Sequence, residues 1–224
     1  MGWELAIFDC DGVLVDSELL THRVLIEALG GLGIELDLAR AIGLFMGNTL
    51  GQNVALIEGM LGRPLPEGFF PEWRESLYAR FRSEPVQAVA GVGEVLDALS
   101  IPVCVVSNGP LMKMRTTLGV TGLLERFGGR LYSSESGLPG KPAPDLFLAA
   151  ARDLGALPAR TFVVEDSVKG VAGAVAAGMR VFGYAAADYV DPAALERAGA
   201  TVFTDMRALP ALIAAAGDQE APCD

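Results

Sequence analysis

Five short apolar runs that each end in polar residues constrain the fold of this 224-residue chain more than any other feature. They occupy residues 5–9, 103–108, 162–166, 181–184 and 201–204. Four consecutive apolar residues, as at 103–106, indicate a strand buried on both faces, which is typical of parallel sheets covered by crossover helices. Helical patterns accompany the later runs, at 93–99, 111–118, 145–154, 168–177 and 192–198. The sequence therefore predicts an α/β fold with a doubly wound parallel sheet.

One long interval interrupts this alternation, because no convincing strand occurs between the first run and residue 103. The interval instead carries apolar side chains at helical spacing, such as Trp73, Leu77 and Phe81, which we expect to pack within a helical bundle. These helices are too many for a simple crossover. We predict an inserted helical cap over residues 17–85, with hinges near Asp16 and Pro85. The α/β core would comprise residues 1–16 and 86–216, followed by a disordered tail at 217–224.

Composition and charge exclude several classes of protein. The net charge of −11 opposes binding to nucleic acid, which requires a basic surface. No apolar run approaches the roughly 20 residues of a membrane helix, so we expect a soluble cytoplasmic protein without a membrane partner, either a monomer or a weak homodimer. Cys10, Cys104 and Cys223 are an odd number without C-x-x-C spacing, which predicts reduced thiols rather than a disulfide or zinc site.

A pair of carboxylates, Asp9 and Asp11, closes the first apolar run. A strand directs residues i and i+2 to one side, so both can face a common pocket while Cys10 points away. Two carboxylates about 4 Å apart repel by about 4 kcal/mol at an effective dielectric near 20, so the pair requires a cation or a shared proton. A polar turn is the alternative interpretation, since Asp and Gly favour turns.

Polar residues also follow the later strands, and the carboxyl ends of parallel strands meet at one edge of a sheet. Beside the pair, the candidate site residues are Ser107, Asn108, Gly109, Lys141, Glu165 and Asp166. The first three precede a helix and offer a hydroxyl and free N–H groups suited to phosphate. Lys141 precedes a proline, which favours an extended, stiff segment. Each could serve an ordinary structural purpose alone, but their joint occurrence at successive strand ends indicates one active site.

These motifs, in this order, resemble those of the haloacid dehalogenase-like hydrolase superfamily. Asp9-Cys10-Asp11-Gly12 is similar to its first motif, Ser107 to its second, Lys141 to its third and Glu165-Asp166 to its fourth. The predicted cap resembles that of the subgroup with β-phosphoglucomutase and small sugar-phosphate phosphatases, and the run 105–110 with Lys113-Met114 resembles 6-phosphogluconate phosphatase-like members. The resemblance implies a Rossmann-like core with an inserted α-helical cap.

The resemblance also implies a magnesium-dependent phosphatase that acts on a small phosphorylated metabolite. Asp9 would be the nucleophile that forms an aspartyl-phosphate, and Asp11 the acid and base. The implied ligands of Mg²⁺ are Asp9, the backbone carbonyl of Asp11, and Asp166, with Glu165 in support. The transferred phosphoryl group would be bound by Ser107, the amides of Asn108 and Gly109, and Lys141, which would also restrain Asp9.

A phosphosugar mutase is the main alternative. In mutase-like relatives the cap loop that resembles residues 44–50 carries cations where this chain has Met46 and Leu50, and a mutase must bind a second phosphate. This departure favours a phosphatase, but it leaves the substrate open, because phosphogluconate phosphatase relatives also tend to carry lysine there. The intact Asp9 and Asp11 disfavour a dehalogenase and a noncatalytic binding protein. We assign no role to His22.

Overall fold

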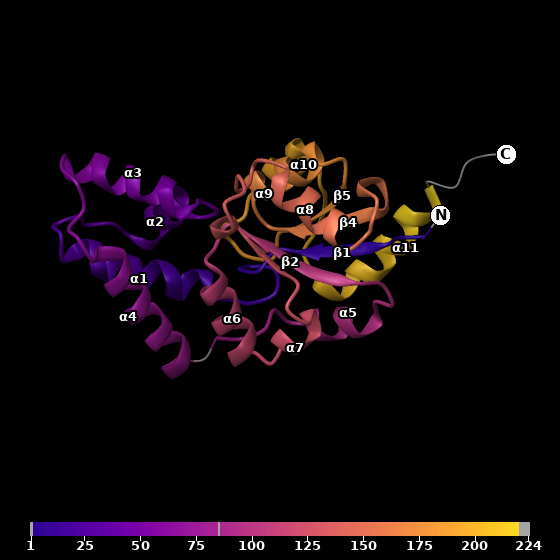
Figure 1. Cartoon of the computed structure of the whole chain (residues 1–224), viewed down its shortest axis with the longest axis horizontal. Helices are drawn as coiled ribbons and strands as arrows, with labels where there is room; N and C mark the ends of the chain where they lie inside the picture. Colours follow the sequence, from indigo (N-terminus) through magenta and orange to yellow (C-terminus); the bar gives the residue numbers. More distant parts are fainter. Residues whose placement is uncertain (1, 85, 220–224) are drawn as a thin grey trace.

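The computed structural model describes residues 2–84 and 86–219, which form a parallel sheet flanked by helices (Figure 1). The order of its six strands is β3-β2-β1-β4-β5-β6, and every neighbouring pair is parallel. The strands are β1 (Leu5–Phe8), β2 (Val103–Ser107), β3 (Leu131–Ser133), β4 (Thr161–Glu165), β5 (Arg180–Tyr184) and β6 (Thr201–Phe203). The predicted α/β class is confirmed. The three-residue β3 is an addition to the five predicted strands.

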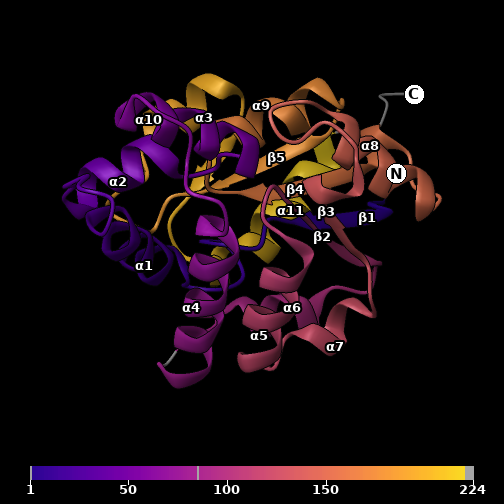
Figure 2. The ribbon, with the colours of Figure 1, turned by 60° about the vertical axis from the view of Figure 1, so that its left-hand side comes forward.

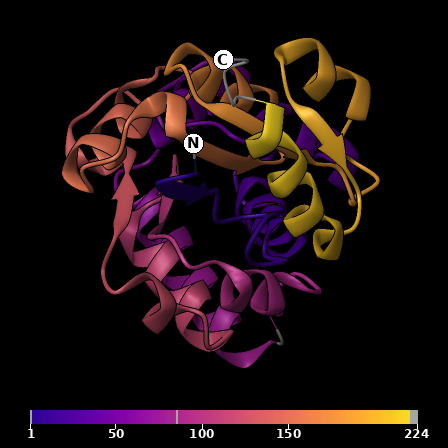
Figure 3. The ribbon, with the colours of Figure 1, turned by 90° about the vertical axis from the view of Figure 1, so that its right-hand side faces the viewer.

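The strand side chains alternate between two apolar clusters, one on each face of the sheet. Phe8, Val105 and Val164 belong to the first cluster, whereas Ile7 and Val106 belong to the second. The first face is covered by α5 (Val92–Ala98), α6 (Leu111–Val120), α7 (Leu124–Phe127) and α11 (Leu209–Gln219). The second is covered by α8 (Asp145–Asp153), α9 (Val168–Ala176) and α10 (Pro192–Ala198) (Figure 3). Burial on both faces explains why the strands read as continuous apolar runs.

Four helices lie beyond the carboxyl ends of the strands, away from the N-terminus and α11 (Figure 1). They are α1 (Glu18–Gly30), α2 (Leu38–Phe45), α3 (Leu50–Leu61) and α4 (Phe69–Ser83). They share a separate apolar cluster that includes Leu29, Ile57 and Phe70. Leu77 and Phe81 do not join it, contrary to our expectation. Because α4 lies beside α6 (Figure 2), these two side chains pack into the first cluster of the core.

The chain passes between the four helices and the sheet through two adjacent segments. The Asp16 N–H donates to the carbonyl of Gln87 at 2.9 Å, and Val15 forms an isolated antiparallel bridge with Ala88. We propose these paired segments as the hinge, with residues 17–85 as the cap and residues 1–16 and 86–216 as the core.

The end of the chain differs from its prediction where it is described. Helix α11 continues to Gln219, so residues 217–219 of the predicted tail are helical, while residues 220–224, with Cys223, lie outside the described residues. Among the described helices, none combines the length and apolar character that a membrane span requires.

Candidate active site

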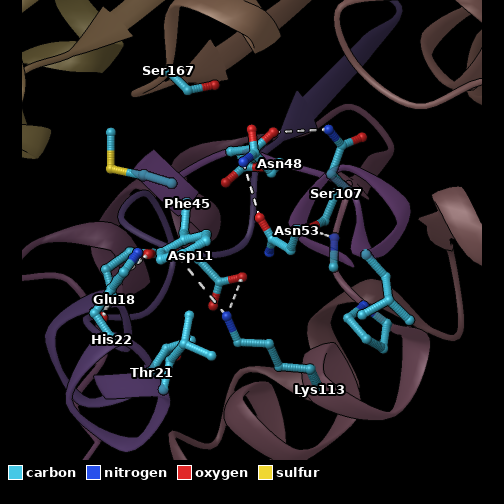
Figure 4. A pocket seen from close by; sticks show the side chains of 18 of the residues that line it. Asp11, Glu18, Thr21, His22, Phe45, Asn48, Asn53, Ser107, Lys113 and Ser167 are labelled. Atoms are coloured by element: carbon cyan, nitrogen blue, oxygen red, sulfur yellow. Dashed lines mark hydrogen bonds and ion pairs between the residues drawn. The ribbon is translucent and has the colours of Figure 1, made fainter. Parts of the chain in front are cut away.

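A cavity of about 120 Å³ lies between the carboxyl ends of the strands and helices α1–α4. Seven of the eight predicted site residues line it, and Glu165 is the exception. The lining on the side of the sheet includes Asp9, Asp11, Ser107, Asn108, Gly109, Lys113, Lys141 and Asp166. The lining on the side of the four helices includes Glu18, Thr21, His22, Phe45, Met46, Asn48, Leu50, Asn53, Trp73 and Arg74. Figure 4 shows how these two sets face each other.

Asp9 follows β1 directly, at the centre of the sheet. Its carboxylate accepts a hydrogen bond from the Lys141 ammonium, which also donates to Glu165. Burial raises the pKa of Asp9 to about 8, since the opposing effect of Lys141 is smaller and the Glu165 and Asp11 carboxylates add to the rise. One buried ammonium therefore lies between two carboxylates, so its single positive charge does not balance both negative charges beside Asp9.

Glu165 is fully buried at the end of β4 and does not line the cavity. One carboxylate oxygen accepts from Lys141, and the other accepts from the backbone N–H and the hydroxyl of Ser167, both at 2.9 Å. Gly170 makes room for this carboxylate, because a Cβ there would lie 1.8 Å from Glu165 Oε1. Close packing against the Glu165 carboxylate therefore accounts for glycine at position 170, and Glu165 anchors Lys141 directly.

Asp11 is held by two donors that are distinct from the Lys141 ammonium bound to Asp9. The Ser17 hydroxyl donates to Asp11 Oδ1. Lys113 Nζ lies 3.0 Å from Asp11 Oδ2 (Figure 4). Burial lowers the pKa of Lys113, but the Asp11 and Glu18 carboxylates outweigh it, so the net shift is upward and the ammonium keeps its proton. Sequence reasoning noted Lys113 only within a resemblance. Its signal as a site residue is its place in the first turn of α6, just after the Ser107 strand end.

Glu18 and His22 extend this charged group into α1. Lys113 Nζ lies 3.9 Å from Glu18 Oε1, and His22 Nδ1 lies 3.2 Å from Glu18 Oε2. Burial raises the pKa of Glu18, but the opposite effects of Lys113 and His22 are larger together, so the pKa falls to about 2. No sequence pattern marks Glu18 as a site residue, and His22, to which we assigned no role, is a buried residue of the cavity wall.

Asp166 lies against the turn that follows Asp11. Gly12 has a φ of +82°, and a Cβ at this position would lie 1.9 Å from Asp166 Oδ2, so only glycine permits the approach. Burial raises the pKa of Asp166 well above its usual range, and the Asp9 and Glu165 carboxylates add to the rise. Asp9 and Asp166 thus form a buried acidic pair that a cation would stabilise.

The predicted metal ligands offer oxygen atoms only: the carboxylates of Asp9 and Asp166 and the backbone carbonyl of Asp11. Mg²⁺ accepts such hard donors and commonly keeps several waters or phosphate oxygens as further ligands. Within residues 2–84 and 86–219, no three or more His, Cys, Asp or Glu side chains are grouped to hold a metal by themselves. The donor set therefore fits Mg²⁺ in chemistry, provided that water and substrate complete its coordination.

The predicted phosphate-binding residues meet at the end of β2. Ser107 Oγ accepts from the Gly109 N–H at 3.0 Å, so in this structure that amide is already paired. The Asn108 side chain accepts from the Lys141 N–H at 2.7 Å and donates at 3.0 Å to the carbonyls of Lys141 and Gly47. Asn108 thus connects the Lys141 loop to the loop after α2, a positioning contact that the sequence did not predict.

The cysteines behave as the sequence predicts where they are described. Cys10 is buried in the first apolar cluster, with its Sγ 3.9 Å from Thr117 Oγ1, and it does not line the cavity. Burial raises its pKa well above the usual range, and the nearby Asp11 and Asp9 carboxylates add to the rise. Cys104 is buried on the other face of the sheet. Both are free thiols.

The chain is similar to known proteins along nearly its whole length. A family model described as haloacid dehalogenase-like hydrolase matches residues 3–178. The chain is 32% identical to the 6-phosphogluconate phosphatase of Escherichia coli K12 over 96% of each chain.

Two solved structures of similar size share the fold. One is a conserved haloacid dehalogenase-like protein from Agrobacterium tumefaciens, with 36% identity, a TM-score of 0.81 and coverage of 96% of this chain and 99% of the other. The second is a haloacid dehalogenase family hydrolase from Deinococcus radiodurans with bound phosphate and sodium, with 34% identity, a TM-score of 0.76 and 96% coverage of each chain.

Proposed function

The chain belongs to the haloacid dehalogenase-like hydrolases, and we propose that it is a magnesium-dependent phosphatase of small phosphomonoesters, such as a sugar phosphate or a phosphogluconate-like compound. One observation carries this proposal: Asp9 and Asp11 line the same cavity, yet each is held by a different lysine. The similarity to a 6-phosphogluconate phosphatase supports the substrate class.

The two aspartates have different partners, which supports different roles. Asp9, restrained by Lys141, attacks phosphorus, and the bond from phosphorus to the ester oxygen breaks as the aspartyl-phosphate forms. Asp11, held by Ser17 and Lys113, gives a proton to the departing alcohol. It then takes a proton from the water that attacks phosphorus, and the bond between Asp9 and phosphorus breaks to regenerate the carboxylate.

Charge on the phosphoryl oxygens is the main demand of such a transfer. Lys141 and Ser107 line the cavity, and the ammonium and the hydroxyl can offset this charge. Asp9, the Asp11 carbonyl and Asp166 would hold Mg²⁺, which when bound supplies further positive charge to the phosphoryl oxygens. Glu165 contributes through Lys141, because its own oxygens are occupied by Lys141 and Ser167.

A phosphosugar mutase remains the alternative function. Met46 and Leu50, which stand where mutase-like relatives carry cations, line the cavity and bring no charge to it. This supports hydrolysis over isomerisation. The test measures free phosphate and sugar-phosphate isomers together, with a panel of phosphosugars, phosphogluconate and nucleotides and with Mg²⁺ present. The proposal predicts phosphate release that is abolished in Asp9→Asn, whereas isomer formation without free phosphate would establish the mutase instead.

A further inference from the structure

Two buried donors on α4 have no hydrogen-bond partner among the residues that the structure describes. They are the indole N–H of Trp73 and the Nε–H of Arg74. Both residues line the active-site cavity and both are half-buried. Buried N–H groups in folded proteins are nearly always paired, because leaving one unpaired costs roughly 1–3 kcal/mol. Trp73 also lines a second cavity, between α1 and the start of α4, so of the two residues only Arg74 is assigned to the active site alone.

The Nη1 atom of the Arg74 guanidinium is paired with Glu135, a residue of the core. Arg74 Nη1 lies 3.5 Å from Glu135 Oε1, while Glu135 Oε2 accepts from the Leu111 N–H at 3.2 Å. The two side chains keep 30% and 43% of their surface exposed, so solvent weakens this ion pair. The contact orients Arg74 but leaves its Nε–H for another partner.

The other cations of the cavity are already engaged with the catalytic carboxylates. Lys141 binds Asp9 and Glu165, and Lys113 binds Asp11 and approaches Glu18. Among the described lysines and arginines that line the cavity, Arg74 alone has no contact with the catalytic carboxylates. Its charge is therefore available to a part of the substrate other than the transferred phosphoryl group.

We propose that Arg74 recognises a carboxylate at the end of the substrate distant from phosphorus, so that the preferred substrates are phosphomonoesters of hydroxy acids. This inference rests on the proposed phosphatase function and narrows its substrate class. A planar carboxylate fits the fork of donors on a guanidinium. A carboxylate fits better than a second phosphate. A phosphate dianion would have only the Arg74 charge beside it, which is already shared with Glu135, because Met46 and Leu50 carry no charge.

The experiment compares kcat and KM for 6-phosphogluconate, for glucose 6-phosphate as its uncharged-end counterpart, and for p-nitrophenyl phosphate. The wild type is expected to favour the acid over the sugar phosphate. Arg74→Met is expected to lower that preference by tenfold to a hundredfold, mainly through KM. Arg74→Lys, which keeps the charge without the guanidinium fork, should give an intermediate preference. Arg82→Met removes an exposed cation from the same helix and should change neither preference nor activity.

Different failures have different meanings in this experiment. If Arg74→Met lowers kcat/KM equally for the acid and the sugar phosphate, Arg74 serves only as a tie to Glu135 and the carboxylate site is refuted. A wild type without preference for the acid refutes it too. If the wild type hydrolyses none of the three compounds, the proposed phosphatase function fails. Calorimetric binding of 6-phosphogluconate to Asp9→Asn, with and without Arg74→Met, then tests the carboxylate site separately, and equal affinities would overturn it.

Discussion

Replacing Gly170 by alanine should damage the active site from outside its cavity. In a helix interior this change normally stabilises by about 1 kcal/mol, because glycine loses more backbone entropy. Here the new Cβ would lie 1.8 Å from Glu165 Oε1 and 1.9 Å from its Cδ, so the buried carboxylate must move. The contacts at stake are the hydrogen bonds from Lys141 and from the N–H and hydroxyl of Ser167.

The magnitude follows from these contacts. Hydrogen bonds to a charged group contribute about 1.5–3 kcal/mol each, so loss of two of the three costs about 3–6 kcal/mol. After the gain in helix propensity, Gly170→Ala should lower the free energy of unfolding by about 2–5 kcal/mol. A displaced Glu165 also frees Lys141, which should lower kcat by more than tenfold through misplacement of Asp9.

Urea unfolding and phosphate release measure the two effects. Gly59→Ala in α3 is the matched control, since its Cβ would meet nothing within 4 Å, and it should stabilise the protein by about 0.4–1 kcal/mol. The reasoning is refuted if Gly170→Ala is as stable and active as Gly59→Ala.

Three further predictions concern Glu18, Asn108 and the two buried cysteines. Because the pKa of Glu18 is depressed to about 2, its stabilising effect is present above the unfolded value near 4.5 and is lost as pH falls toward 2. Urea unfolding at pH 5 and pH 2 should show the wild type losing about 3 kcal/mol more than Glu18→Gln, and parallel losses would contradict the shift. Asn108→Ala frees the Lys141 loop from Gly47, so we expect kcat/KM to fall tenfold to a hundredfold; full activity would show that the contact is dispensable. Cys10 and Cys104 have raised pKa values and no exposed surface, so in a Cys223→Ser variant a thiol reagent should label neither until urea unfolds the protein.

The sequence was sufficient for the sheet because its central strands are buried on both faces, and a short continuous apolar run such as 103–106 is typical of a strand in that position. The edge strand β3 was missed since three residues, two of them half-buried, show no period. Helix α11 was missed although Leu209, Ile213 and Ala216 recur at helical spacing and pack on the core. The expectations of a cytoplasmic location and of a monomer or weak homodimer stay predictions.

The sequence predicted those site residues that follow the ends of strands. Asp9, Asp11, Ser107 and Asp166 reach the cavity because the carboxyl ends of parallel strands meet there. Lys113 and Arg74 lie on helices, where a cation usually faces solvent. Lys113 reaches the cavity from the first turn of α6, directly after β2, whereas Arg74 reaches it through the packing of α4 beside α6. The direction of Glu165 toward Lys141 depends on the space left by Gly170, which strand phase does not encode.

Identification of the phosphorylated residue tests the central claim most directly. The Asp11→Asn variant is mixed with p-nitrophenyl phosphate, whose leaving group needs little proton donation, and the reaction is quenched in acid during turnover. The expected result is one phosphoryl group on the peptide that contains Asp9, because water attack then lacks its base. Phosphate on another residue, or turnover that never populates a phosphorylated protein and proceeds undiminished in Asp9→Asn, would contradict the account.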